Sequence, residues 1–243
     1  MPARLLRGKT MLSTRERIGA GHLGAPAGVL FNGRMLKSDF IPSPAGVPGP
    51  LLIMMHGLGD SIEGYRWLPL GIKIPQLSYL LLNAPDSYYG GFSWYDFVEN
   101  PGPGIKRSRE LVFDVIEAYR QKGFDTSKMF IGGFSQGCLM TLDVGLRSPH
   151  RFAGLIGISG YVHEPAALIP ELSPVAREQQ LLITHGTQDT LLPIDQVRAQ
   201  VAMLREAGLK IEWREFQKAH TIAGEAELDL LRTFIKARLN AGA

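Results

Sequence analysis

Residues 128–137, KMFIGGFSQG, join an apolar run to the pattern G-x-S-x-G centred on Ser135, and a helical pattern follows in residues 138–147, CLMTLDVGLR. A serine hydroxyl is a weak nucleophile, so it must be held on a tight turn and given a base. Gly133 and Gly137 remove side chains that would collide where a strand bends into a helix. The stretch predicts a strand, a sharp turn bearing a nucleophile and a helix; the alternative is a tight turn with an incidental serine.

Apolar runs alternate with helical patterns along the rest of the chain. The runs resemble buried strands and span residues 51–56, 77–85, 128–134, 152–160, 180–186 and 210–216. Helical periodicity covers residues 105–122, 136–147, 194–207 and 224–239. This alternation predicts an α/β protein with a mostly parallel central sheet and helices on both faces. Functional residues should follow the strands, because active sites in such sheets lie beyond the carboxyl ends.

The N-terminal part differs from the rest in charge. Residues 1–38 hold seven Lys or Arg against one Glu, net +6, whereas the remaining 19 basic and 22 acidic residues give −3. We interpret residues 1–27 as a basic, poorly ordered leader and residues 28–243 as a single domain. Segments GVLF (28–31) and RMLKSDFI (34–41) flank Asn32-Gly33, a strong hairpin signal.

Composition also limits which partners and which cellular compartment the protein is expected to have. The acidic body argues against a nucleic-acid surface, and no apolar run reaches the ~20 residues of a membrane span. The single cysteine, Cys138, excludes an internal disulfide and suits a reducing compartment, so we expect a soluble cytoplasmic protein. The chain lacks nucleotide-binding and metal-binding motifs, which predicts chemistry without a cofactor or metal. The oligomeric state stays open, a homodimer included.

A nucleophile needs a base and an acid, which follow the serine in the chain order Ser, Asp, His in hydrolases of this topology. His220 follows the run 210–216 and is our candidate base, with His163 as the alternative; His150 lies at the opposite end of the sheet and His185 precedes the candidate acid. That acid is Asp189, in the loop directly after the run 180–186, with Asp195 and Asp143 as alternatives. A carboxylate in this loop would orient the imidazole.

Acyl transfer also requires donors for an oxyanion. The backbone N–H of Gln136 follows the nucleophile at a helix N-terminus, and the N–H of Leu58 lies in HGLGD (56–60) after the first buried run. We expect the His56 side chain to stabilise this loop rather than to take part in chemistry.

A long segment, residues 86–104, is rich in aromatics and glycines and too irregular for an element of its own. Because it follows a strand, we expect it to form a wall of an apolar acyl site. The candidate substrate-binding residues are Tyr88, Tyr89, Phe92, Trp94 and Tyr95; the alternative is an aromatic cluster that packs the loop onto the body. Residues 161–174 are the candidate opposite wall, and Cys138 has no expected catalytic role.

Five segments together resemble the phospholipase/carboxylesterase family of α/β hydrolases, which includes acyl-protein thioesterases and bacterial carboxylesterases. They are HGLGD (56–60), NAPDSYYGGFSWYD (83–96), FIGGFSQG (130–137), THGTQDTLLP (184–193) and KAHTI (218–222). The resemblance implies the α/β-hydrolase fold and the same roles for Ser135, Asp189, His220, Leu58 and Gln136. The helix after Ser135 resembles bacterial members more than the protein-depalmitoylating branch, and Ala219 stands where members often have glycine.

The sequence thus predicts a serine carboxylesterase that acts on a small-molecule or lipid-like ester, a thioester or a lysophospholipid through an acyl-enzyme intermediate. Two alternatives stay open. One is an amidase or peptidase of the same fold, because a triad does not choose the leaving group. The other is a ligand-binding protein with a vestigial triad.

Overall fold

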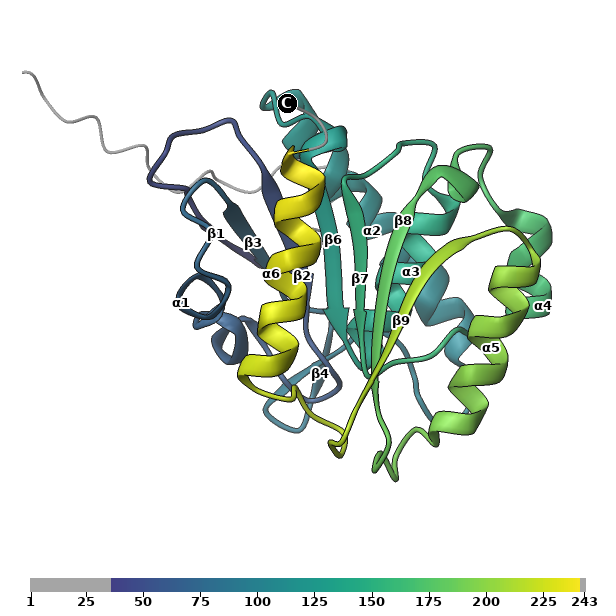
Figure 1. Ribbon diagram of the computed structural model, residues 1–243. Coiled ribbons are helices and arrows are strands. Elements are labelled where there is room, and N and C mark those ends of the chain that lie inside the picture. Colours follow the sequence, from purple (N-terminus) through teal and green to yellow (C-terminus); the bar gives the residue numbers. More distant parts are fainter. Residues whose placement is uncertain (1–35, 241–243) are drawn as a thin grey trace, which may run out of the picture.

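The computed structural model describes residues 36–240, and these residues form a seven-stranded sheet in the order β1-β3-β2-β6-β7-β8-β9 (Figure 1). Its strands are β1 (Ser38–Ile41), β2 (Leu51–Met55), β3 (Ser78–Leu82), β6 (Met129–Phe134), β7 (Gly154–Ile158), β8 (Gln180–Gly186) and β9 (Lys210–Phe216). β1 pairs antiparallel with β3, and the other neighbours are parallel. The predicted mostly parallel sheet is confirmed, with one strand in each apolar run. The predicted leader and the Asn32-Gly33 hairpin turn lie outside the described residues.

The helices are α1 (Leu68–Ile72), α2 (Pro101–Gln121), α3 (Gln136–Arg147), α4 (Pro165–Leu168), α5 (Ile194–Glu206) and α6 (Glu225–Asn240). The bounds of α3, α5 and α6 agree with the predicted ranges to within one residue. Helix α2 begins four residues before the predicted start, at Pro101. Proline is favoured in a first helical turn because its missing N–H has no partner to lose there. No helix within residues 36–240 is both long enough and apolar enough to cross a membrane.

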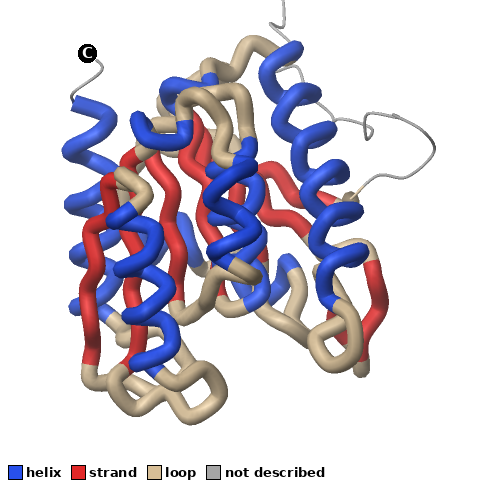
Figure 2. The backbone as a smooth tube through the Cα atoms, turned by 90° about the vertical axis from the view of Figure 1, so that its right-hand side faces the viewer, coloured by secondary structure: helices blue, strands red, loops and turns tan. Residues whose placement is uncertain are grey.

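Helices cover both faces of the sheet, with α6 in front and α2 and α3 behind in Figure 1, as the edge view in Figure 2 also shows. Strand β2 illustrates the consequence for the sequence. Leu51, Ile53 and Met55 belong to the core that includes residues of α2, α3 and α5, whereas Leu52 and Met54 belong to a second core with α1 and α6. A strand buried on both faces needs apolar residues at every position, which explains the continuous runs.

The segment 86–104 contains a hairpin that the sequence analysis did not predict, β4 (Asp86–Tyr88) and β5 (Gly91–Ser93). Its two turn residues, Tyr89 and Gly90, have φ of 42° and 91°. Positive φ at both positions defines the turn whose twist suits a two-residue hairpin, usually marked by Asn-Gly or Asp-Gly. The sequence signal for the turn is missing because its first residue is a tyrosine, which rarely adopts positive φ, instead of Asn or Asp.

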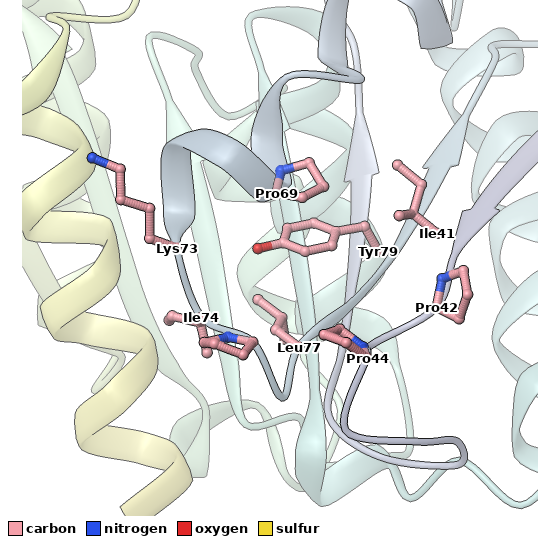
Figure 3. Close-up of a pocket in the computed structure, with 9 residues that line it drawn as sticks. Ile41, Pro42, Pro44, Pro69, Lys73, Ile74, Leu77 and Tyr79 are labelled. Atoms are coloured by element: carbon pink, nitrogen blue, oxygen red, sulfur yellow. The ribbon is translucent and has the colours of Figure 1, made fainter.

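A cavity of about 310 Å³ lies beside α1 at the amino end of β3 (Figure 3). Four prolines contribute to its lining, namely Pro42, Pro44, Pro69 and Pro75. The Tyr79 ring lies across it, and the Tyr79 hydroxyl is buried without a hydrogen-bond partner among residues 36–240. This cavity lies at the opposite end of the strands from the residues predicted to be catalytic.

Candidate active site

Ser135 occupies the turn between β6 and α3, with φ 54° and ψ −114°. The two flanking glycines allow this strained turn to pack. A Cβ atom on Gly133 would lie 2.1 Å from the carbonyl oxygen of Gly137, and one on Gly137 would lie 2.1 Å from that of Met55. Because backbone atoms cannot move aside as a flexible side chain does, the G-x-S-x-G pattern is here a steric requirement. Non-glycine residues at such dihedrals cluster at functional sites.

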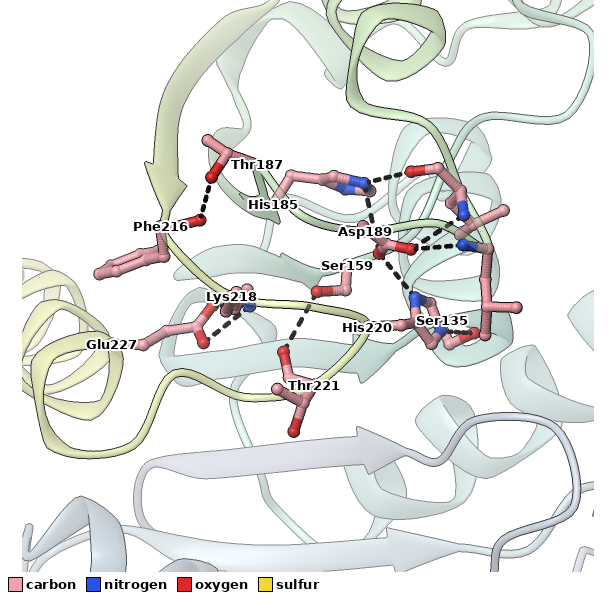
Figure 4. A network of polar contacts seen from close by, with 12 residues as sticks. Ser135, Ser159, His185, Thr187, Asp189, Phe216, Lys218, His220, Thr221 and Glu227 are labelled. Atoms are coloured by element: carbon pink, nitrogen blue, oxygen red, sulfur yellow. Dashed lines mark hydrogen bonds and ion pairs between the residues drawn. The ribbon is translucent and has the colours of Figure 1, made fainter.

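Ser135, His220 and Asp189 lie in one hydrogen-bonded chain (Figure 4). The Ser135 Oγ is 2.8 Å from His220 Nε2, and His220 Nδ1 is 2.7 Å from Asp189 Oδ2. An ionised carboxylate only accepts, so Nδ1 carries the proton and Nε2 accepts from the serine O–H. The loops that follow β8 and β9 bring the acid and the imidazole to the carboxyl end of β6. This arrangement allows the imidazole to take the serine proton.

The surroundings of Asp189 keep it ionised. Burial of the side chain opposes the charge, but hydrogen bonds from the Leu192 N–H and from His220 hold the pKa of Asp189 below its usual value. The second carboxylate oxygen accepts the N–H groups of Leu191 at 3.0 Å and Leu192 at 2.9 Å. The carboxylate therefore has a fixed orientation, set by its own loop.

The buried side chain of His185 stabilises the loop that carries Asp189. Its Nε2 donates to the carbonyl oxygen of Leu192 at 2.8 Å, and its ring stacks on Trp213 with centroids 5.9 Å apart. Burial lowers the pKa of His185, so the ring is neutral at physiological pH. This role has no signal in the sequence, because it depends on a contact across seven residues of an irregular loop.

The alternative bases and acids have other partners. Within residues 36–240, neither Ser135 nor His220 forms a hydrogen bond with His150, His163, Asp143 or Asp195. The structure pairs His150 with Glu117, His163 with Glu164, Asp195 with Arg198, and Asp143 with Arg109 and Arg147. The alternatives considered from the sequence therefore do not join the chain of hydrogen bonds.

Gln136 has two distinct functions at the start of α3. Its backbone N–H belongs to the first helical turn, where an N–H has no acceptor within the helix. Its buried side chain accepts the Trp94 N–H at 3.0 Å and donates to the Tyr95 carbonyl oxygen at 3.1 Å. The side chain thus fixes the segment after β5 against the helix, and Gln136 is one of the residues that line the same cavity as Ser135.

The loop of the second predicted oxyanion donor, Leu58, packs directly on the turn that carries Ser135. A Cβ atom on Gly57 would come within 3.0 Å of the Phe134 ring and 3.3 Å of the Ser135 Cβ. The His56 Nδ1 donates to the Gly57 carbonyl oxygen at 2.6 Å. These contacts place Leu58 in the wall of the same cavity as Ser135.

His56 is confirmed as a residue that stabilises this loop. Its Nε2 accepts the N–H of Ala84 at 3.0 Å, and burial lowers the pKa of His56, so the imidazole is neutral. Trp94 donates from its indole Nε1 to the His56 carbonyl oxygen at 2.9 Å. Trp94 is 0% exposed and belongs to the core, which corrects its predicted place in the substrate site: the large ring packs beneath the loop.

The cavity at Ser135 has a volume of about 460 Å³, within the range of small-molecule sites. Its lining is mainly apolar or aromatic and includes Leu58, Tyr88, Tyr95, Phe97, Phe134, Tyr161, Leu191 and Leu192. The Tyr95 and Tyr161 hydroxyls form a hydrogen bond of 3.2 Å. The cavity therefore offers an apolar wall with a few polar groups next to the serine.

The structure places only some of the predicted wall residues at the cavity. Tyr88 lines the cavity, whereas Tyr89 is 95% exposed in the hairpin turn and Phe92 packs against the core, so neither belongs to the lining. Tyr161 is the part of segment 161–174 that reaches the cavity. Leu191 and Leu192 were missed, although an apolar pair that begins two residues after the candidate acid is a signal that points to them.

The fold and this site define an α/β hydrolase, and comparisons identify the family. The sequence model of the family described as Phospholipase/Carboxylesterase matches residues 36–239. The chain belongs to the phospholipase/carboxylesterase family and is a hydrolase.

The chain is similar to relatives of two kinds. It is 29% identical over 204 residues to acyl-protein thioesterase 1 of Schizosaccharomyces pombe, covering 78% of this chain and 91% of the relative. It is 28% identical over 206 residues to the carboxylesterase SOBER1 of Arabidopsis thaliana, covering 77% and 90%. The crystal structure of SOBER1 superposes with a TM-score of 0.72 at 26% identity, covering 78% of this chain and 99% of that one. The relatives do not single out the bacterial branch that the α3 sequence suggested.

Proposed function

We propose that this protein is a serine carboxylesterase that works through an acyl-enzyme intermediate. The hydrogen-bonded chain from Ser135 through His220 to Asp189, at an apolar cavity, carries the proposal. His220 takes the Ser135 proton as Oγ attacks the ester carbonyl, and then gives that proton to the departing alcohol. Water next attacks the acyl carbonyl, its proton passing to His220 and on to Ser135 as the acid leaves. The N–H groups of Leu58 and Gln136 bind the oxyanion in both steps.

The proposed substrate is a small-molecule or lipid-like acyl ester. The apolar lining and the names of the relatives, acyl-protein thioesterase and carboxylesterase, support an acyl group bound to oxygen or sulfur, a lysophospholipid included. The mechanism requires no cofactor or metal. The cytoplasmic location remains part of the proposal, supported by a sole cysteine, Cys138, that is buried and unpaired.

The test is a p-nitrophenyl ester series from acetate to palmitate, with reaction of a fluorophosphonate probe at the nucleophile as an independent readout. Ser135→Ala should lower kcat by about 10⁴-fold or more and abolish labelling. Cys138→Ala is the matched control, because this thiol lies one helical turn away and burial raises its pKa to about 12. Labelling that persists in Ser135→Ala would rule out the proposed nucleophile.

The same preparation separates the two alternatives. Turnover of p-nitroanilides without turnover of esters or thioesters would favour an amidase or peptidase. Tight binding of acyl products with no turnover and no labelling would favour a ligand-binding protein, which the hydrolase family and the named relatives argue against.

A further inference from the structure

A buried ion pair lies behind the loop that carries His220. Lys218 is 5% exposed and Glu227 is 0% exposed. The Lys218 Nζ lies 2.6 Å and 2.8 Å from the two carboxylate oxygens of Glu227 (Figure 4). Lys218 precedes His220 by two residues, and Glu227 lies in the first turn of α6. Burying two charges costs desolvation that their attraction offsets only in good geometry, so this pair is weak evidence for stability alone.

Glu227 holds the loop on both sides of His220. Besides Lys218 before the histidine, it accepts the N–H of Ala223 after the histidine, at 2.6 Å. One buried carboxylate on a helix of 16 residues therefore fixes both ends of a short irregular segment. The loop between these anchors has one further contact, because the carbonyl oxygen of Thr221 accepts the Ser159 hydroxyl at 3.3 Å.

Lys218 also connects this loop to the loop of the acid. Its carbonyl oxygen accepts the N–H of Gln188, the residue before Asp189, at 3.0 Å. A Cβ atom on Gly186 would lie 2.3 Å from that carbonyl oxygen, so the two loops are in close backbone contact. A shift of Lys218 would therefore change the position of His220 relative to Asp189 as well as to Ser135.

We propose that Lys218 and Glu227 are positioning residues that hold His220 in register with both Ser135 and Asp189. The inference rests on the proposed function, since it gives the pair a role only in proton transfer through His220. Neither residue lines the cavity at Ser135, so substrate binding should not depend on them directly. A misplacement of about 1 Å in a catalytic group costs roughly 10²-fold in rate.

The experiment compares Glu227→Ala with the double variant Lys218→Met/Glu227→Gln. Glu227→Ala leaves the ammonium buried without a partner and frees the Ala223 N–H, so kcat per folded molecule should fall about 10²-fold while KM stays near the wild-type value. The double variant removes both charges but keeps an amide oxygen for the Ala223 N–H. The kcat of the double variant should be at least about tenfold higher than that of Glu227→Ala, because neutral replacement of a buried pair is often tolerated.

Glu225→Gln is the matched control. Glu225 lies two residues earlier in the same helical turn, but it pairs with Lys73 and Arg232 instead of with the loop, so this variant should keep the wild-type kcat. Where Glu227→Ala does not fold, Glu227→Gln takes its place and should show a smaller loss of kcat at constant KM.

Two outcomes overturn the proposal. One is a wild-type kcat per folded molecule in the Glu227 variants, which would leave the pair a purely structural role. The other is a double variant that recovers no activity. Ser135→Ala distinguishes these from failure of the proposed function: if that variant keeps full activity, the serine mechanism itself is wrong, whereas its inactivity beside fully active Glu227 variants rejects the positioning role alone.

Discussion

The two ends of the central sheet each border a cavity, and the cavities differ in kind. At the carboxyl ends, about 460 Å³ are lined in part by Ser135 and His220, which lie in a chain of hydrogen bonds. At the amino end of β3, about 310 Å³ are lined by prolines, aliphatic side chains and Lys73 around Tyr79. A cavity is thus not enough to make a site. Loops that follow parallel strands bring polar groups from distant parts of the chain to one point.

Backbone strain divides between the same two ends. Among the described residues, five non-glycine residues have positive φ. Ser135, Ser159 and Glu164 lie in segments that follow the carboxyl ends of β6 and β7, Tyr89 lies in the turn of the β4-β5 hairpin, and Lys73 borders the amino-end cavity. Strained residues persist where the surrounding structure determines them strongly, as at binding and catalytic sites. The comparison predicts that changes at the carboxyl ends act strongly, on activity or on stability, whereas those at the amino end act weakly on stability and not on activity.

After loss of the nucleophile itself, the largest effect is expected from Asp189→Asn. The amide cannot stabilise the imidazolium and favours the wrong tautomer of His220, so kcat on p-nitrophenyl butyrate should fall about 10⁴-fold. Asp195→Asn is the control, because Asp195 is exposed and pairs with Arg198. A loss below about tenfold in Asp189→Asn would contradict the role of the acid.

A large loss of stability is expected from Gly137→Ala. The added methyl would lie 2.1 Å from the Met55 carbonyl oxygen and 2.8 Å from that of His56, so helix α3 must move away from β2. We expect the free energy of unfolding in urea to fall by about 3 kcal/mol. Gly102→Ala is the control in the first turn of α2, where the nearest atom would be 3.8 Å away. Equal stability of the two variants would mean that the turn between β6 and α3 tolerates a side chain at position 137.

An intermediate effect concerns pH. Burial lowers the pKa of His56 and of His185 in the folded state, so below about pH 6.5 the unfolded chain binds protons that the folded protein does not. The free energy of unfolding should therefore fall as the pH decreases from 7 to 5, by up to about 1.4 kcal/mol per pH unit for each histidine.

Urea unfolding of wild type and His56→Asn at several pH values checks this dependence. The variant should be less stable at pH 8, because Ala84 loses its acceptor, and should lose less stability on acidification. Parallel pH profiles for the two proteins would exclude His56 as a source of the effect.

The smallest effect is expected at the amino-end cavity. Tyr79→Phe removes a buried hydroxyl that has no partner among residues 36–240, so the free energy of unfolding should stay within about 1 kcal/mol of wild type or rise. The kcat on p-nitrophenyl butyrate should not change. A marked loss of stability would show that the hydroxyl has a partner in solution, and a loss of kcat would break the comparison between the two ends.

Much of this architecture could be predicted from the sequence, because local patterns encode it. Continuous apolar runs predict the positions of the strands. The G-x-S-x-G pattern and the chain order Ser, Asp, His predict that Ser135, Asp189 and His220 lie together, as the hydrogen bonds between them show. The remainder depends on contacts between distant segments. The aromatic residues around Trp94 in the sequence predict that it lines the acyl site, but tertiary packing sets its position beneath the His56 loop. No local periodicity links Lys218 to Glu227.

The burial of Trp94 has a spectroscopic consequence. The three tryptophans occupy different environments, since Trp94 is fully enclosed, Trp213 stacks on His185 and Trp67 is 37% exposed. Acrylamide should quench the fluorescence of Trp67 readily and that of Trp94 hardly at all. In a Trp67→Phe/Trp213→Phe background, the emission maximum of Trp94 would report directly on whether the Leu58 loop stays closed over the indole.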